Sequence, residues 1–121
     1  MRVRCIKLDK PHADQSDGWL TIGREYDVLE LYCDVSRGVM LRIIGDEPLT
    51  PALFKGELFE MVNDAIPGTW VAGRDKLGGY KFGPKVWHEP GFWERFFDQE
   101  PKAVKTFTEE YRLMKEIVQA N

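Results

Sequence analysis

The chain has 121 residues, of which 43% are hydrophobic and 31% charged, and this balance is typical of one folded domain rather than of a disordered chain. Its net charge of −3 opposes general binding to nucleic acid or to anionic membranes, so either would need a local basic patch. No apolar run approaches the roughly 18 residues of a membrane span, and the run after Met1 is too short for a signal sequence. We therefore expect a cytoplasmic protein that does not bind membranes.

The first half of the chain predicts strands. Residues 2–8 alternate imperfectly between basic and apolar side chains and favour a first strand, and residues 9–18 are rich in turn formers and favour a loop. Residues 20–44 predict a β-hairpin, because apolar side chains recur at alternate positions on both sides of a turn at residues 36–38. Cys5 and Cys33 lie in these strand-like runs, where we expect reduced, buried thiols, with a disulfide as the alternative.

The middle of the chain is broken by turn-forming residues. Residues 45–51 contain Gly45, Pro48 and Pro51 and predict an irregular connection. Residues 52–62 favour a short turn followed by a strand at residues 58–62, with an amphipathic helix as the alternative. Residues 66–87 predict a second hairpin around a glycine-rich turn.

The C-terminal part predicts two helices. Pro90 suits the first position of a short helix, and Pro101 opens a longer one. The short helix has an aromatic face and the long one an apolar stripe about 21 Å long, with these residues: Phe92, Trp93, Phe96 and Phe97, then Val104, Phe107, Tyr111, Met114 and Val118. We therefore predict a single α+β domain over residues 1–121, in which a small twisted antiparallel β-barrel at residues 2–87 is capped by C-terminal helices within residues 90–120.

A family resemblance supports the barrel. The segments LTIGREYDVLEL, GVMLRIIGDEP and ALFKGELFEMV resemble the strand and loop pattern of small Src-homology-3-like barrels in uncharacterised bacterial and phage proteins. The resemblance covers residues 19–62, and its matching positions are core or turn positions of such a barrel: Leu20, Gly23, Tyr26, residues 43–46 and residues 59–62. It implies a barrel of bacterial or phage origin and brings no functional residue with it. The chain departs from the pattern after residue 65, where it continues far beyond one closing strand.

Catalytic and metal-binding patterns are weak. His12, His88, Cys5 and Cys33 lack the close spacing of zinc ligands, and the sequence has no nucleophile elbow and no phosphate-binding glycine motif. We therefore expect no enzyme activity, no cofactor and no metal. A small-molecule-binding or enzyme domain that uses His12 and His88 is an alternative.

Aromatic residues are concentrated between residues 70 and 97, where eight of the fifteen Phe, Trp and Tyr residues lie. Exposed Trp, Tyr and Arg side chains dominate protein-binding hot spots. We therefore expect a non-catalytic protein-interaction or regulatory module of an accessory protein. Its predicted partner-binding residues are Trp70, Arg74, Tyr80, Lys81, Trp87, Trp93 and Arg95.

The alternative partner is single-stranded nucleic acid. Residues 69–87 carry Arg74, Lys76, Lys81 and Lys85 against Asp75, interleaved with aromatic rings, which is the composition of a stacking groove. The acidic side chains of residues 88–100 would repel a phosphate backbone, so a protein partner is favoured. A homodimer is compatible with the sequence.

Overall fold

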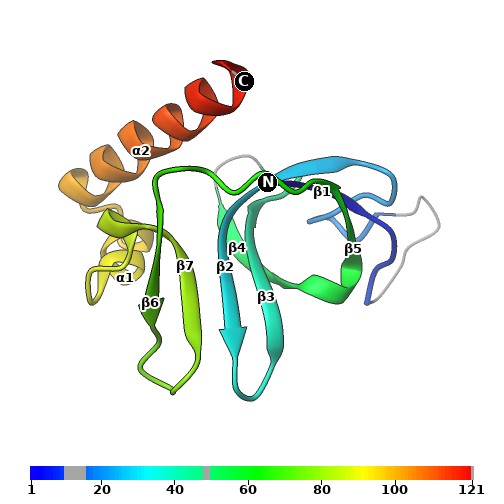
Figure 1. Ribbon diagram of the computed structural model, residues 1–121, viewed down its shortest axis with the longest axis horizontal. Helices are drawn as coiled ribbons and strands as arrows, with labels where there is room; N and C mark the ends of the chain where they lie inside the picture. Colours follow the sequence, from blue (N-terminus) through cyan, green and yellow to red (C-terminus); the bar gives the residue numbers. More distant parts are fainter. Residues whose placement is uncertain (10–15, 48–49, 121) are drawn as a thin grey trace.

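A central antiparallel sheet organises the protein. The computed structural model describes residues 1–9, 16–47 and 50–120, with side chains described up to residue 116 of the last helix. Within these ranges lie seven strands, all paired antiparallel, and two C-terminal α-helices (Figure 1). The α+β class predicted from the sequence is confirmed, although the described strands do not close into a ring. The predicted loop around His12 lies mostly outside the described residues.

The predicted first hairpin is confirmed as β2 (Glu25–Asp34) and β3 (Gly38–Ile44). Its turn is held by the carboxylate of Asp34, whose Oδ1 accepts hydrogen bonds from the backbone N–H groups of Ser36 and Arg37 at 2.8 and 3.0 Å. Gly38 follows with φ of 76°, a left-handed conformation that glycine adopts without strain. The sequence therefore encodes this turn locally.

A β-bulge changes the direction of side chains in the middle of β2. The register with β3 shifts between Val28 and Glu30. As a result Val28 and Leu31 pack in or against one hydrophobic cluster, whereas Leu29 belongs to a second. A bulge places an extra residue on one strand and breaks the strict alternation of faces. One strand thereby supplies two cores.

The other strands surround this hairpin. They are β1 (Arg2–Cys5), β4 (Pro51–Lys55), β5 (Phe59–Asn63), β6 (Trp70–Arg74) and β7 (Tyr80–Pro84). The strand order is β4-β3-β2-β1-β5, and β7, which carries β6 on its other side, also pairs with β2. The predicted second hairpin, β6–β7, is confirmed, and β1 is shorter than the predicted strand at residues 2–8.

The sequence predicted an irregular connection at residues 45–51 followed by a short turn, and the structure instead has strand β4 at Pro51–Lys55. Pro51 begins β4 and lies opposite Ile44 of β3. Proline is tolerated at the first residue of an edge strand, because its missing N–H is not required there. A single 3-10 turn, η1 (Gly56–Leu58), then leads into β5, close to the predicted strand at residues 58–62.

The helices lie beside the β6–β7 hairpin (Figure 1). After the 3-10 turn η2 (Lys85–Trp87), helix α1 (Phe92–Phe97) begins two residues later than predicted, because Gly91 at the N-cap is left-handed with φ of 77°. Helix α2 (Pro101–Ala120) begins at Pro101 as predicted. No helix in the described ranges has the length and apolar character needed to cross a membrane.

Two hydrophobic cores result. The first lies among the strands and consists of Val3, Cys5, Leu20, Tyr26, Val28, Leu41, Ile43, Leu58 and Phe59. The second joins the sheet to the helices and consists of Leu29, Trp87, Phe92, Phe96, Ala103, Phe107 and Met114. The predicted stripe on α2 is confirmed at Phe107 and Met114, with Val104 and Tyr111 packed against the same core. The side chain of Val118 lies outside the described residues.

Candidate interaction surface

The predicted partner-binding residues do not form one patch. Trp87 is 2% exposed and belongs to the second core, against which Trp70 and Trp93 also pack. The ring of Trp87 therefore cannot meet a partner in this conformation, which corrects its assignment to a binding surface. Tyr80 and Lys81 are consecutive in β7, and successive side chains of a strand point to opposite faces.

The remaining predicted residues have separate environments. Lys81 is half-buried, and its Nζ donates to the carbonyl of His88 at 3.4 Å. Arg95 lies on α1, donates to the carbonyl of Pro90 at 3.0 Å and lies 3.8 Å from the carboxylate of Glu89. Of the seven residues, only Arg74 and Tyr80 have exposed side chains.

Arg74 and Tyr80 belong to a row of exposed side chains that crosses β3, β2, β7 and β6. Val39 lies opposite Cys33, Cys33 opposite Tyr80, and Tyr80 opposite Arg74. Directly opposite residues of neighbouring strands share a face of the sheet. Val39 is 49% exposed and Tyr80 54%, and the guanidinium of Arg74 lies 5.7 Å from the centre of the Tyr80 ring. Cys33, expected to be buried, is exposed in this row as a free thiol.

The tips of the two hairpins extend this row. The β2–β3 and β6–β7 turns lie at the same end of the molecule (Figure 1). They carry Val35, 75% exposed, and Leu77, 70% exposed. A Cβ on Gly78 would lie 3.8 Å from Val35, so the two turns are neighbours. We call this region the hairpin-end surface and define it by Cys33, Val35, Val39, Arg74, Leu77 and Tyr80.

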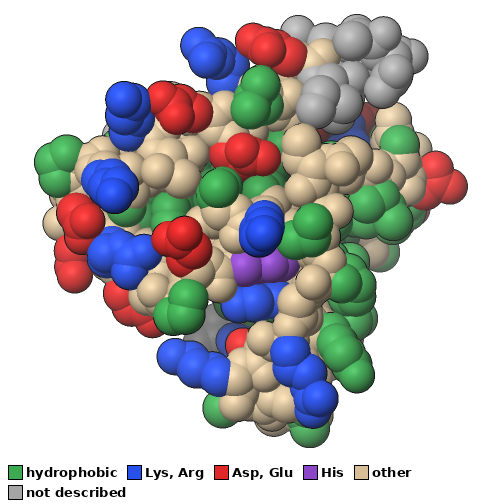
Figure 2. Space-filling model, turned by 60° about the vertical axis from the view of Figure 1, so that its left-hand side comes forward, with side chains coloured by type: hydrophobic (Ala, Val, Ile, Leu, Met, Phe, Trp, Pro, Cys, Tyr) green, Lys and Arg blue, Asp and Glu red, His purple; other side chains and the backbone are tan. Residues whose placement is uncertain are grey.

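The hairpin-end surface has a small excess of basic side chains, and Arg37 among them is paired with Asp34 at 2.9 Å. Figure 2 shows Lys and Arg side chains at the lower end of the molecule as well as over its upper part, whereas most Asp and Glu side chains in this view lie higher. The charged residues of the two turns on this face are Arg37, Arg74 and Lys76 against Asp34 and Asp75, a net charge of +1, because Lys81 points to the opposite face. Hydrogen bonds from Arg37 and Ser36 hold the pKa of Asp34 well below its usual value, so this carboxylate is already engaged.

The opposite face of the same strands holds a buried polar cluster that sequence reasoning missed. The side chain of Glu30 is fully buried, and its Oε1 accepts hydrogen bonds from Arg42 Nε and from the Tyr32 hydroxyl, both at 2.9 Å. The Arg42 guanidinium lies 3.9 Å from the centre of the Trp93 ring. A sequence signal did exist, since each charge stands between two apolar residues in a predicted strand.

His88 borders this cluster. Its Nε2 lies 3.8 Å from Glu30 Oε2, and its side chain is 11% exposed. Burial, and then the nearby charge of Lys81, lowers the pKa of His88, so the imidazole is neutral at neutral pH. Burial raises the pKa of Glu30 against the opposing effects of Arg42 and Tyr32, and burial together with the charge of Glu30 raises the pKa of Tyr32 to about 12. The Nε2 edge of the His88 ring is buried beside Glu30.

Comparison of the chain with protein-family models, with curated proteins and with solved structures gives no match.

Proposed function

We propose that the protein is a non-catalytic interaction module that binds an acidic segment of a partner protein through the hairpin-end surface. The observation that carries this proposal is the continuous row of Val39, Cys33, Tyr80 and Arg74, extended by exposed apolar side chains at both turns. Exposed apolar side chains with a charged rim are typical of protein-binding sites. The net positive charge around them favours an acidic partner.

The burial of the tryptophans favours protein over single-stranded nucleic acid. A stacking groove needs several exposed rings along a basic channel. Trp70, Trp87 and Trp93 pack in or against the second core, and Tyr80 is the exposed ring on the hairpin-end surface. Apolar contacts and one tyrosine suit a protein segment better than a run of bases.

We further propose that residues 2–63 form a half-open Src-homology-3-like barrel, to which β6, β7 and the helices are added. Support comes from the pairing of β5 with β1, by which the last strand of this segment returns to the first. An antiparallel sheet in which the last strand pairs with the first has a connectivity that small barrels use. With the resemblance described above, this proposal favours an accessory protein of bacterial or phage origin that acts in the cytoplasm.

A pull-down from the source cell with quantitative mass spectrometry tests the binding proposal. The Leu77→Asp and Arg74→Glu variants should each fail to capture the partner, and Tyr80→Ala should weaken binding of the partner by roughly 2 kcal/mol. The matched control is Leu113→Asp on α2, a leucine that is 43% exposed and distant in sequence from both turns. A partner that survives the first two changes, or that is equally lost in the control, would contradict the proposal.

Titration with mixed-sequence single strands tests the alternative. Micromolar binding that weakens steeply between low and moderate salt would favour nucleic acid, because it reports the release of counterions from phosphates.

A further inference from the structure

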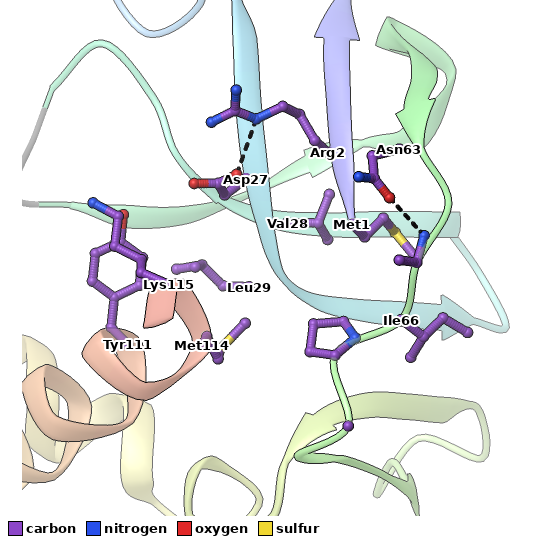
Figure 3. Close-up of a pocket in the computed structure, with 13 residues that line it drawn as sticks. Met1, Arg2, Asp27, Val28, Leu29, Asn63, Ile66, Tyr111, Met114 and Lys115 are labelled. Carbon is purple, nitrogen blue, oxygen red and sulfur yellow. Dashed lines mark hydrogen bonds and ion pairs between the residues drawn. The ribbon is translucent and has the colours of Figure 1, made fainter. Parts of the chain in front are cut away.

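A cavity of about 470 Å³ lies beneath helix α2, bounded by β1, β2 and the segment that joins β5 to β6 (Figure 3). Its walls are largely apolar and include Val28, Leu29 and Met114, each at most 5% exposed, with Pro67 also buried. Figure 3 shows Met114 of α2 and Ile66 of the connecting segment on either side of the opening between helix and strands. Ligand-binding cavities commonly have this size and character.

The polar groups of the cavity leave a positive charge without an acidic partner. Arg2 pairs with Asp27 through a 3.1 Å contact between Nε and Oδ1 and with Glu25 at 3.6 Å, and the Met1 ammonium also interacts with Asp27. Lys115, by contrast, has no ion pair among the described residues, and its Nζ lies over the Tyr111 ring, 4.9 Å from the ring centre. Asn63 uses its carbonyl oxygen to accept the N–H of Ala65 at 2.9 Å, which leaves the two amide hydrogens as donors. The unmatched groups are therefore a cation and donors.

We propose that this cavity binds a small amphipathic carboxylate, with its apolar body against Leu29 and Met114 and its carboxylate beside Lys115. The side chain of Ile66 is 67% exposed at the cavity and would be covered by such a ligand. Burial of each methylene should strengthen binding about fourfold. The cavity shares no residue with the hairpin-end surface, so this inference stands independently of the proposed function.

Calorimetric titration with decanoate tests the head-group requirement. The protein should bind decanoate saturably, and should bind decylamine, which has the same chain length and the opposite charge, at least tenfold more weakly. Lys115→Gln should weaken the binding of decanoate about fivefold while leaving the binding of decanol unchanged. Lys105→Gln, an exposed lysine of the same helix that does not line the cavity, should leave both unchanged. Absence of saturable decanoate binding, or equal binding of decylamine, would overturn the proposal.

Two further variants test the location. Met114→Trp should fill the cavity and abolish binding of decanoate and decanol, whereas Leu113→Trp, at the neighbouring exposed position, should not. Because a buried tryptophan can disturb folding, Ile66→Glu provides a second test at an exposed position and should weaken decanoate at least tenfold by charge repulsion. Unchanged decanoate binding in Ile66→Glu, or in a folded Met114→Trp protein, would place the ligand elsewhere and overturn the assignment.

Discussion

Replacement of Arg42 by methionine should destabilise the protein far more than the loss of an ordinary ion pair. Arg42 and Glu30 have side chains that are 8% and 0% exposed, and Arg42 Nε lies 2.9 Å from Glu30 Oε1. Without the guanidinium, the buried carboxylate retains the Tyr32 hydroxyl at 2.9 Å but loses its cation. Removal of one partner of a buried pair typically costs 3–5 kcal/mol, so we expect a loss of about 4 kcal/mol. Loss of the guanidinium stacked on Trp93 adds to this cost.

The double variant Glu30→Leu with Arg42→Met separates the ionic interaction from packing. Replacing both members of a buried ion pair by apolar residues of similar volume is often neutral or stabilising. We therefore expect the free energy of unfolding of the double variant to lie within about 1 kcal/mol of that of the original protein, or to exceed it. The resulting coupling energy is about 3 kcal/mol or more. Urea unfolding at pH 7, followed by tryptophan fluorescence, measures these differences if the slope m is unchanged.

An exposed ion pair serves as the control. Arg4 donates to Glu60 at 2.8 Å, but the two side chains are 40% and 50% exposed. Arg4→Met should therefore cost less than about 1 kcal/mol. If Arg42→Met costs no more than this control, or if its cost and that of Glu30→Leu simply add in the double variant, the buried pair does not have the role that we assign to it.

Three further changes test other parts of the fold. Phe107→Ala should cost about 3–5 kcal/mol in a denaturant melt, because the ring is 8% exposed in the second core; an effect within error would mean that α2 does not pack there. Gly83→Ala should cost about 1–3 kcal/mol, because its Cβ would lie 2.7 Å from Glu30 Cγ, whereas Gly68→Ala meets no atom within 4 Å and should be nearly neutral; equal effects would refute the steric argument. The pKa of Asp34 is lowered in the folded state, so the ionised carboxylate stabilises the fold at pH values above the unfolded pKa of about 3.9. This stabilisation is lost as the pH falls below that pKa. Asp34→Asn should therefore reduce the loss of stability on acidification below pH 4, and an unchanged acid profile would contradict this.

The elements that could be predicted from the sequence are those with a local pattern. The hairpins at residues 20–44 and 66–87 have alternating side chains around turn formers, and α2 has both a proline at its start and a continuous apolar stripe. Strand β4 was missed because Pro51 and the glycine at residue 56 indicate an interruption. Pairing with β3 on one side makes a short strand stable there despite the proline.

The site was predicted less well, because burial depends on elements far apart in the sequence. The composition of residues 70–97 does not reveal that Trp87 lies in the second core and Trp93 packs against it while Tyr80 faces solvent. The pairing of Glu30 with Arg42 depends on the register across a bulge, which alternation alone cannot specify. Cys33 is exposed because the helices cover only the other face of β2.

The bulge in β2 connects the two surfaces to which we assign binding. Before it, residues 25–27 pair with β1 and close the first core; after it, residues 31–33 pair with β7 instead. The sheet therefore divides at Val28 and Leu29, and these two residues line the cavity beneath α2. The branch after the bulge carries the aromatic second core on one face and leaves the row from Val39 to Arg74 exposed on the other. Because the rings are used to attach the helices, the high aromatic content of residues 70–97 explains the fold of this branch, whereas its turns and its uncovered face are the parts that remain accessible to a partner.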